Sequence, residues 1–279
     1  MLLVTLFSFG MISFPFCKIN LGLRVTARRP DGYHELETCF YPLPWTDVLE
    51  IIPAAPHAFH TTGYTIPGKE EDNLCLKAYR LLQHDFNLPP VQIHLHKIIP
   101  MGAGLGGGSS DAAFVLRTLN DIFALNLSVQ KLQEYAARLG SDCSYFIQDK
   151  AMLGTGRGEI LTPIEVSLQR LHYVLVKPDI HVSTAEAYAG IVPRPAEKSI
   201  TQILQQPIAT WRHNLVNDFE YTVFVKHPLI ADIKATLYNQ GALYASMSGS
   251  GSSVFGLFAQ PVDLQYHFRG MIYRTGELN

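Results

Sequence analysis

The sequence of 279 residues is poor in charge: only 16% of it is Asp, Glu, Lys or Arg, and the net charge is −2. Without a basic excess, the chain has no electrostatic means of holding nucleic acid or an anionic membrane surface, so neither is expected as a partner. The hydrophobic fraction of 47% can fill one large core or two medium ones. An anionic small ligand would therefore need a local binding device.

Cysteine and long apolar runs are also scarce. The four cysteines, at 17, 39, 75 and 143, form no C-x-x-C pair, which indicates reduced thiols of a cytoplasmic protein. The N-terminal MLLVTLFSFGMISF is too short for a membrane span and lacks the positive start of a signal peptide, so we expect its first ten residues to be a dispensable extension or the result of a misplaced start. His94 and His96 would share one face of a strand, but further ligands are missing and no metal site is predicted.

The pattern of apolar residues predicts an α+β protein of two-layer domains. Strands are expected at 12–25, 35–43, 47–53 and 91–99, and helices at 74–86, 112–123 and 128–139. Ser109, Ser110 and Asp111 are expected to supply the cap and the first-turn acidity of the helix at 112–123. Beyond a domain boundary near residue 150, we expect a hairpin at 151–164, a strand at 171–178, helices within 213–241 and a second glycine-rich turn within 242–259.

The segment IIPMGAGLGGGSSDAA (98–113) is the most informative stretch, with five glycines at positions 102–108. Bare main-chain N–H groups can converge on an anion, and the N-terminus of the following helix points its dipole the same way. Together they bind phosphate without a basic surface. The hydroxyls of Ser109 and Ser110 add donors and can approach a phosphate-bound Mg²⁺.

Three kinds of phosphate-binding loop compete for this segment. A Walker loop needs a lysine after the glycines, and none is present. Gly102, Gly104 and Gly107 match a dinucleotide fingerprint, but the next segment is helical, so the βαβ unit is missing. The third kind is a nucleotide loop of the form P-x-G-x-G-L-G-G-[GS]-S-S, which the chain matches from Pro100 to Ser110.

Two residues could carry proton transfer and charge neutralisation. Asp142 follows the helix end at Gly140 and starts the next element; the residues alone favour a plain N-cap over a base. Lys18 shares a strand face with Phe16 and Asn20, which is unusual for a solvated lysine, although an edge-strand charge is the alternative.

The motifs, in this order, resemble the GHMP kinase superfamily. PMGAGLGGGSSDAA resembles its ATP loop, while KINLGL, RPDGYHELET, EDNL, LGSDCSYF and SGSGSSVF resemble one member family that acts on a cytidine diphosphate derivative. The resemblance runs from about residue 12 onward. It implies an ATP-binding and catalytic domain at 1–150, a substrate-binding domain at 151–279 whose last residues can return to the first domain, and a site in the cleft.

By position in these motifs, the resemblance implies Lys18 and Asp142 as the catalytic lysine and base. ATP, carrying Mg²⁺, would be bound by residues 100–110 and one asparagine: Asn73, Pro100, Met101, Gly102, Ala103, Gly104, Leu105, Gly106, Gly107, Gly108, Ser109 and Ser110. The acceptor would be bound by Asn20, Tyr33, His34, Thr184, Tyr188, Gly249 and Gly251. Within this set, His34 would read the cytosine edge, and a ring sandwich between Tyr33 and Tyr188 is our hypothesis.

The expected function is ATP-dependent phosphorylation of the 2-hydroxyl of 4-diphosphocytidyl-2-C-methyl-D-erythritol, in the mevalonate-independent route to isoprenoids, by a cytoplasmic monomer or homodimer. The alternatives are another GHMP-type kinase acting on mevalonate, homoserine or a sugar, a dinucleotide-dependent oxidoreductase, and a non-catalytic nucleotide sensor. One residue departs from the pattern: Asp111 stands where many relatives have Asn or Ala. A carboxylate beside phosphates is electrostatically awkward unless it faces the helix amides or Mg²⁺.

Overall fold

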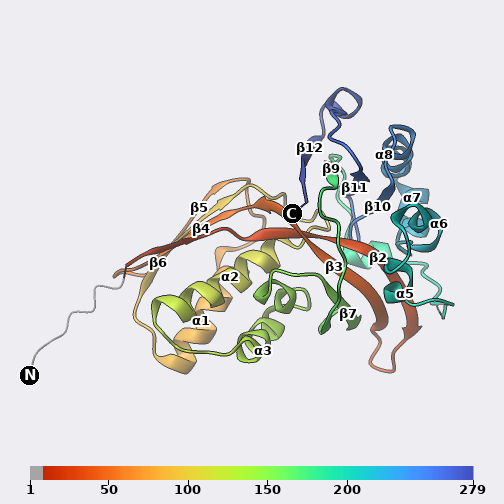
Figure 1. Cartoon of the computed structure of the whole chain (residues 1–279). Helices are drawn as coiled ribbons and strands as arrows, with labels where there is room; N and C mark the ends of the chain where they lie inside the picture. Colours follow the sequence, from red (N-terminus) through yellow and green to blue (C-terminus); the bar gives the residue numbers. More distant parts are fainter. Residues whose placement is uncertain (1–8, 196, 279) are drawn as a thin grey trace, which may run out of the picture. The chain divides into compact units, whose positions relative to one another are not determined.

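The computed structural model describes residues 9–195 and 197–278. The expectation about an N-terminal extension falls mainly on residues 1–8, which lie outside the described residues. The chain divides into two compact units. Figure 1 shows the helices and strands of the chain, coloured from the N-terminus to the C-terminus. Unit 1 holds the residues up to Cys17, Trp45–Met101 and Gly106–Asp149, and unit 2 holds Lys18–Pro44, Gly102–Leu105 and the residues from Lys150 onward.

The described residues form strands and helices in the following order. The strands are β1 (Met11–Ser13), β2 (Phe16–Arg28), β3 (His34–Thr46), β4 (Val48–Pro53), β5 (Ala58–Gly63), β6 (Val91–Lys97), β7 (Met152–Gly156), β8 (Ile160–Pro163), β9 (His172–Lys177), β10 (Tyr244–Met247), β11 (Val254–Phe258) and β12 (Ile272–Glu277). The α-helices are α1 (Leu74–Phe86), α2 (Gly107–Ile122), α3 (Val129–Leu139), α4 (Thr184–Tyr188), α5 (Ile200–Leu204), α6 (Trp211–Asn214), α7 (Glu220–Lys226) and α8 (Pro228–Asn239). Short 3₁₀ helices are η1 (Glu70–Asp72), η2 (Cys143–Ile147), η3 (Ile208–Thr210) and η4 (Gln265–Phe268).

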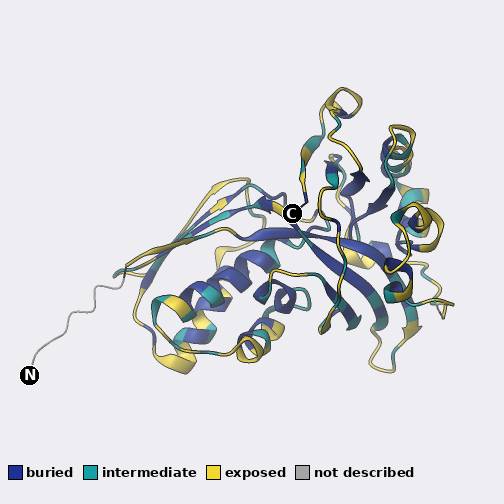
Figure 2. Ribbon diagram, in the orientation of Figure 1, coloured by how far each residue is buried: buried dark blue, intermediate teal, exposed yellow. Residues whose placement is uncertain are grey.

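Unit 1 is a sheet in the order β1-β4-β6-β5 with helices on one face. β4 pairs antiparallel with both β1 and β6, and β5 runs parallel to β6. Helix α2 lies against β4 and β1, and α1 packs on α2; Figure 2 shows that α2 is buried along most of its length. This is the expected two-layer arrangement, since the apolar stripe of α2 is buried on the apolar face of the strands.

Two local predictions need correction. The strand expected at 12–25 is broken at Pro15 into β1 and β2, because proline has no N–H for a sheet ladder; its carbonyl instead accepts from the Asp47 N–H at 2.8 Å. β5 was absent from the sequence-based prediction. Its residues, AFHTTG, are mostly exposed, so they lack the alternation that marks a half-buried strand.

Unit 2 contains two sheets, in the orders β2-β3-β7-β8 and β10-β11-β9-β12. α8 packs on β10 and β11, over a core that includes Val174, Val254 and Leu237. The hairpin, the strand, the helices and the second glycine-rich turn predicted beyond residue 150 are all present: β7–β8, β9, α6–α8 and the β10–β11 turn. The last described strand, β12, pairs with β9 of the same unit.

The compact units do not follow a single division at residue 150. Residues Lys18–Pro44 belong to unit 2 because most of β2 and β3 pair in the same sheet as β7 and β8. The assignment of a nucleotide role to one domain and an acceptor role to the other stays a prediction.

The cysteines are buried and form no disulfide in the described part of the chain. Burial raises the pKa of Cys39 to about 12 and that of Cys143 to about 11. Among the described helices, none combines the length and the apolar character needed to cross a membrane. His94 and His96 both hydrogen-bond the Thr62 hydroxyl, and residues 9–195 and 197–278 hold no group of three or more potential metal ligands.

Candidate active site

A pocket of about 260 Å³ lies in unit 1, beside the glycine run. Its apolar lining includes Phe59, Ile66 and Leu74, and its polar lining includes Asn73. Asn73 is the N-cap of α1, where its side chain accepts from the Cys75 N–H at 2.9 Å. The cap thus fixes one wall of a pocket whose size and apolar faces suit a flat ring.

The glycine run turns directly into α2. Gly102, Gly104 and Gly106 have φ of 62°, 76° and 71°, a left-handed backbone that glycine adopts without strain. Gly106 is itself the N-cap residue, no side chain caps the helix, and the Ser110 N–H donates to the Gly106 carbonyl at 2.9 Å. The predicted cap at Ser109, Ser110 and Asp111 is therefore wrong, because the helix starts earlier than those side chains could cap it.

The other residues of the run are placed as follows. Pro100, Met101 and Gly106–Ser110 belong to unit 1, and Met101 and Gly108 line the pocket. Gly107 is the first helical residue of α2, and the Ser110 hydroxyl is buried without a hydrogen-bond partner among the described residues. Gly102, Ala103, Gly104 and Leu105 belong to unit 2.

Asp111 does not face the helix amides. Its Oδ2 accepts from the Lys97 ammonium at 2.8 Å, and Lys97 also pairs with Asp47. All three side chains are buried. Burial raises the pKa of Asp111 to about 8, and the neighbouring Asp47 adds to this, while Lys97 opposes it. The carboxyl group of Asp111, which the sequence left unexplained, thus pairs with the buried Lys97 ammonium.

Lys18 is a buried cation of unit 2, with 3% of its surface exposed. Its Nζ donates to Asn20 Oδ1 at 2.5 Å and to the Gly104 carbonyl at 3.0 Å. The main-chain N–H of Lys18 donates to the Leu105 carbonyl at 3.0 Å. The Asn20 amide in turn donates to the Thr38 hydroxyl at 2.9 Å. Lys18 is therefore fixed against the glycine run rather than solvated at a sheet edge.

The second glycine motif packs on the first within unit 2. The Ser248 hydroxyl donates to the Gly104 carbonyl at 2.9 Å, and a Cβ on Gly104 would lie 2.0 Å from the Ser248 carbonyl oxygen. Gly249 and Gly251, predicted for acceptor binding, are buried in this turn with φ of 55° and 90°. The close approach explains why glycine is needed at 104.

Asp142 lies in unit 1, half-buried, at the residue before η2. Its side chain makes no cap hydrogen bond. The plain N-cap, which the residues alone favoured, is therefore not the role of this carboxylate.

Three of the predicted acceptor residues, Tyr33, His34 and Tyr188, lie at or against the end of the turn between β2 and β3. The His34 ring stacks on Tyr188, with centroids 4.8 Å apart and planes at 18°. Tyr33 is 56% exposed, and the Arg157 guanidinium lies over its ring at 4.9 Å. Thr184 is exposed at the first turn of α4. The structure thus places His34, rather than Tyr33, against Tyr188.

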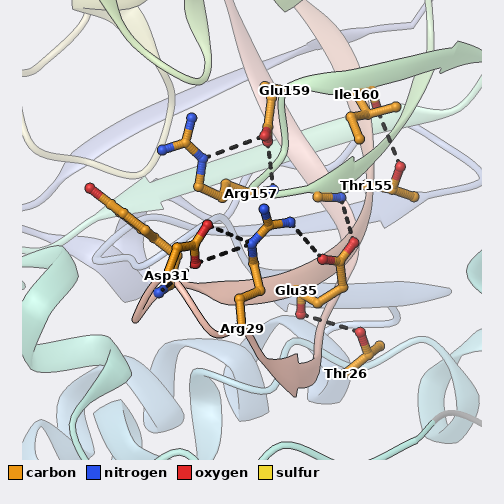
Figure 3. Close-up of polar contacts among 10 residues, drawn as sticks. Thr26, Arg29, Asp31, Glu35, Thr155, Arg157, Glu159 and Ile160 are labelled. Atoms are coloured by element: carbon orange, nitrogen blue, oxygen red, sulfur yellow. Dashed lines mark hydrogen bonds and ion pairs between the residues drawn. The ribbon is translucent and has the colours of Figure 1, made fainter.

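Ion pairs brace this turn (Figure 3). Arg29 pairs with Asp31 at 3.1 Å and with Glu35 at 2.9 Å, and Glu35 also accepts from the Gly156 N–H at 3.0 Å. The backbone before Tyr33 and His34 is therefore held to β7 by side chains that the sequence reasoning did not single out.

Sequence reasoning also missed Lys97, Asp47 and Asn217. Lys97 is at a buried position in the alternation of β6, which was a readable signal for a paired lysine. The Asn217 amide donates to the carbonyls of Met247 and Gly249, at 2.8 Å each, and supports the second glycine motif. No local pattern marks that role, because the contacts span 30 and 32 residues.

Comparison with known proteins gives matches along most of the chain. Residues 73–150 match the family GHMP kinases N terminal domain, and residues 200–266 match GHMP kinases C terminal. A 4-diphosphocytidyl-2-C-methyl-D-erythritol kinase of Cytophaga hutchinsonii is 54% identical over 249 residues, covering 89% of this chain and 92% of the relative. The kinase of the same name from Bacteroides thetaiotaomicron is 55% identical over 252 residues, with the same coverage.

Solved structures of GHMP kinases also match the chain. A crystal structure of a 4-(cytidine 5'-diphospho)-2C-methyl-D-erythritol kinase matches with a TM-score of 0.82 at 30% identity, over 96% of this chain and 100% of that one. The Methanococcus jannaschii mevalonate kinase, at 14% identity and a TM-score of 0.66, covers 96% of this chain and 98% of its own, and shares the fold alone.

Proposed function

The chain belongs to the 4-diphosphocytidyl-2-C-methyl-D-erythritol kinase family of the GHMP kinases, and we infer from this that it phosphorylates the 2-hydroxyl of 4-diphosphocytidyl-2-C-methyl-D-erythritol. It is an ATP-dependent small-molecule kinase of the mevalonate-independent route to isoprenoid precursors. The buried Lys18 ammonium donates a hydrogen bond to the Gly104 carbonyl of the glycine run, and this contact is the main support in the chain for the proposed active site.

The residues present fit a nucleoside triphosphate. The pocket has apolar walls for a base, the adjoining backbone has glycines where side chains would block phosphates, and the buried Ser110 hydroxyl has no protein partner among the described residues. ATP, when bound, supplies the transferred phosphoryl group, with Mg²⁺ carried on its phosphates. Asn73 and Met101 would hold the base, and the main-chain N–H groups of Gly106–Ser110 would hold the phosphates.

Lys18 and Asp142 are proposed to act on the acceptor alcohol. The Asp142 carboxylate takes the proton of the 2-hydroxyl, while the new oxygen–phosphorus bond forms and the bond to the leaving oxygen of ADP breaks. The Lys18 ammonium lowers the pKa of that hydroxyl and offsets charge on the phosphoryl group in transfer. Asn20 Oδ1 accepts from the Lys18 ammonium, and we propose that Asn20 orients this ammonium and contacts the acceptor.

The acceptor's cytosine is proposed to bind at the braced turn of unit 2. His34 would hydrogen-bond the base edge, and Tyr33 and Tyr188 would supply ring faces. The stacking of His34 on Tyr188 gives Tyr188 a second task, which is to hold the imidazole in place. Thr184, Gly249 and Gly251 are proposed contacts for the diphosphate and erythritol parts.

A coupled ADP-release assay across a panel of acceptors tests the function. We expect turnover with 4-diphosphocytidyl-2-C-methyl-D-erythritol and none with mevalonate, homoserine or galactose. Lys18→Ala and Asp142→Asn should each lower kcat by about 10²–10⁴-fold, the usual range for a positioned acid, base or charge. Lys150 and Asp149 are exposed and serve as controls of the same residue types: Lys150→Ala and Asp149→Asn should retain activity.

The rival functions give different results. Turnover of mevalonate or homoserine, without binding of the cytidine compound, would mean that the chain is a kinase with a different acceptor. Full ADP production by both Lys18→Ala and Asp142→Asn would show that neither Lys18 nor Asp142 has the proposed catalytic role. Fluorescence titration with NADH tests whether the chain is a dinucleotide-dependent oxidoreductase. That function requires saturable binding of NADH.

A further inference from the structure

The main chain of Tyr33 is held from both sides at the turn between β2 and β3. Its N–H donates to Asp31 Oδ1 at 3.1 Å, and its carbonyl accepts from the Arg29 N–H at 2.8 Å. The residue is nonetheless 56% exposed. An exposed side chain changes rotamer within nanoseconds, so the fixed main chain does not by itself set the direction of the ring.

The Arg157 guanidinium packs on this ring, 4.9 Å from its centroid. Arg157 is itself fixed in the turn between β7 and β8: its Nε donates to Glu159 Oε1 at 3.4 Å and its main-chain N–H donates to Glu159 Oε2 at 2.5 Å (Figure 3). A guanidinium over an aromatic face is attracted by the negative face of the ring. Arg157 therefore holds the Tyr33 ring in one direction and covers one of its two faces.

The opposite face of the Tyr33 ring is available to a ligand. Among residues 9–195 and 197–278, no second ring or cation packs on Tyr33. Tyr188, the other tyrosine predicted to bind the acceptor, already has one face against His34, with ring centroids 4.8 Å apart. A base that binds at this turn thus meets an open tyrosine face whose direction depends on Arg157.

We propose that Arg157 is a positioning residue of the acceptor site, which holds the Tyr33 ring so that its open face stacks on the cytosine. Stacking requires a set distance and angle between two rings. A ring that is already held loses less conformational entropy when the base binds, so binding is tighter. The proposal rests on the proposed function only in taking the cytosine of a cytidine diphosphate compound as the base bound at this turn.

The test measures binding of cytidine diphosphate by calorimetry to the chain saturated with Mg-ADP, so that the donor pocket is already filled. We expect Arg157→Ala to raise the Kd at least about threefold, since it removes an exposed cation–π contact and frees the ring. In the ADP-release assay, the KM for 4-diphosphocytidyl-2-C-methyl-D-erythritol should rise by a similar factor. The kcat and the KM for Mg-ATP should stay within about twofold of native.

A double-mutant cycle with Tyr33→Ala separates positioning from direct contact with the ligand. In the Tyr33→Ala background, Arg157→Ala should change the Kd by less than about twofold, because no ring is left to hold. Arg157→Lys keeps the charge but not the planar group, so it should weaken binding less than Arg157→Ala. Arg269→Ala is the matched control, because this guanidinium lies 4.5 Å from the ring of Tyr266, which is 74% exposed in the same unit; its Kd should not change.

A native chain that does not bind cytidine diphosphate, or an Arg157→Ala variant whose Kd is less than about threefold above native, overturns the proposal. A change of about twofold or more in the Tyr33→Ala background also overturns it, because Arg157 would then act on the ligand without the ring. Binding that depends on Arg157, in a chain that phosphorylates none of the acceptors, supports the positioning role and removes the proposed function. Turnover of the cytidine compound that is independent of Arg157 has the opposite meaning, so the two can fail separately.

Discussion

At the scale of single residues, Asn217 is the buried amide that ties the second glycine motif to the rest of unit 2. Its Nδ2 donates to Met247 and Gly249, and its Oδ1 accepts from the Phe219 N–H at 3.0 Å. Asn217→Asp keeps the shape of the side chain, but a carboxylate oxygen would then face the two carbonyl oxygens and be repelled by them. We expect a loss of about 2–4 kcal/mol in the free energy of unfolding by urea, and a fall in kcat, because Gly249 is a proposed acceptor contact.

Asn214→Asp is the control for this substitution. Asn214 is exposed and its amide donates to the Thr210 carbonyl, so the same chemical change there should cost under about 1 kcal/mol. Equal losses in the two variants would mean that the buried contacts of Asn217 contribute little.

Asp111 also predicts how stability depends on pH. Its folded pKa, about 8, lies above the ordinary value of 3.8, so folding favours the protonated form. The contribution is fully present below about pH 4 and is lost as the pH rises toward 8, with Lys97 and Asp47 facing the same group. Thermal unfolding from pH 4 to pH 8 should therefore show a steeper decline in the native chain than in Asp111→Asn; parallel curves would contradict this.

At the scale of elements, the turn through Gly104 depends on the absence of a side chain. Gly104→Ala would add both the strain of a positive φ and a contact of 2.0 Å with the Ser248 carbonyl. Gly270→Ala is the matched control, since Gly270 has φ of +78°, close to the +76° of Gly104, but nothing within 4 Å. We expect Gly270→Ala to cost about 1 kcal/mol, and Gly104→Ala to cost several times more and to abolish activity, as measured by urea unfolding and ADP release.

The elements that sequence could predict are those with a local signal. The pattern of apolar residues predicted the strand at 91–99 and the helices at 74–86 and 128–139, and the structure confirms them as β6, α1 and α3. β5 lacked such a signal because its pairing with β6, rather than its own burial pattern, makes it a strand. The start of α2 was misplaced because the left-handed Gly106 is the N-cap, and composition alone cannot assign the N-cap to one glycine among five.

The candidate site shows the same division. The glycine run, Lys18 and Asn73 could be predicted as site residues because each lies in a recognisable sequence motif. The partners of Asp111 and the support from Asn217 could not be read, because they depend on contacts between residues 14 or more positions apart. Such contacts follow from the register of strands and the packing of turns.

At the scale of the whole molecule, the chain passes between its two units at 17/18, 44/45, 101/102, 105/106 and 149/150. A fragment of residues 150–279 therefore lacks β2 and β3, and β3 is the strand that pairs with β7 in the sheet β2-β3-β7-β8. We expect this fragment to show no cooperative unfolding transition by circular dichroism, because the β7–β8 hairpin alone cannot form a stable sheet. A cooperative transition would show that the second sheet of unit 2 is sufficient.

The buried thiols give each unit its own chemical reporter. Cys39 lies in unit 2, whereas Cys75 and Cys143 lie in unit 1, and burial raises the pKa of all three. Only the thiolate is alkylated, so modification in the native state must wait for the surrounding structure to open. Pulsed alkylation followed by peptide mass spectrometry would thus time the opening of the two units separately. Nucleotide should slow the reaction at Cys75, which lines its proposed pocket, more than at Cys39.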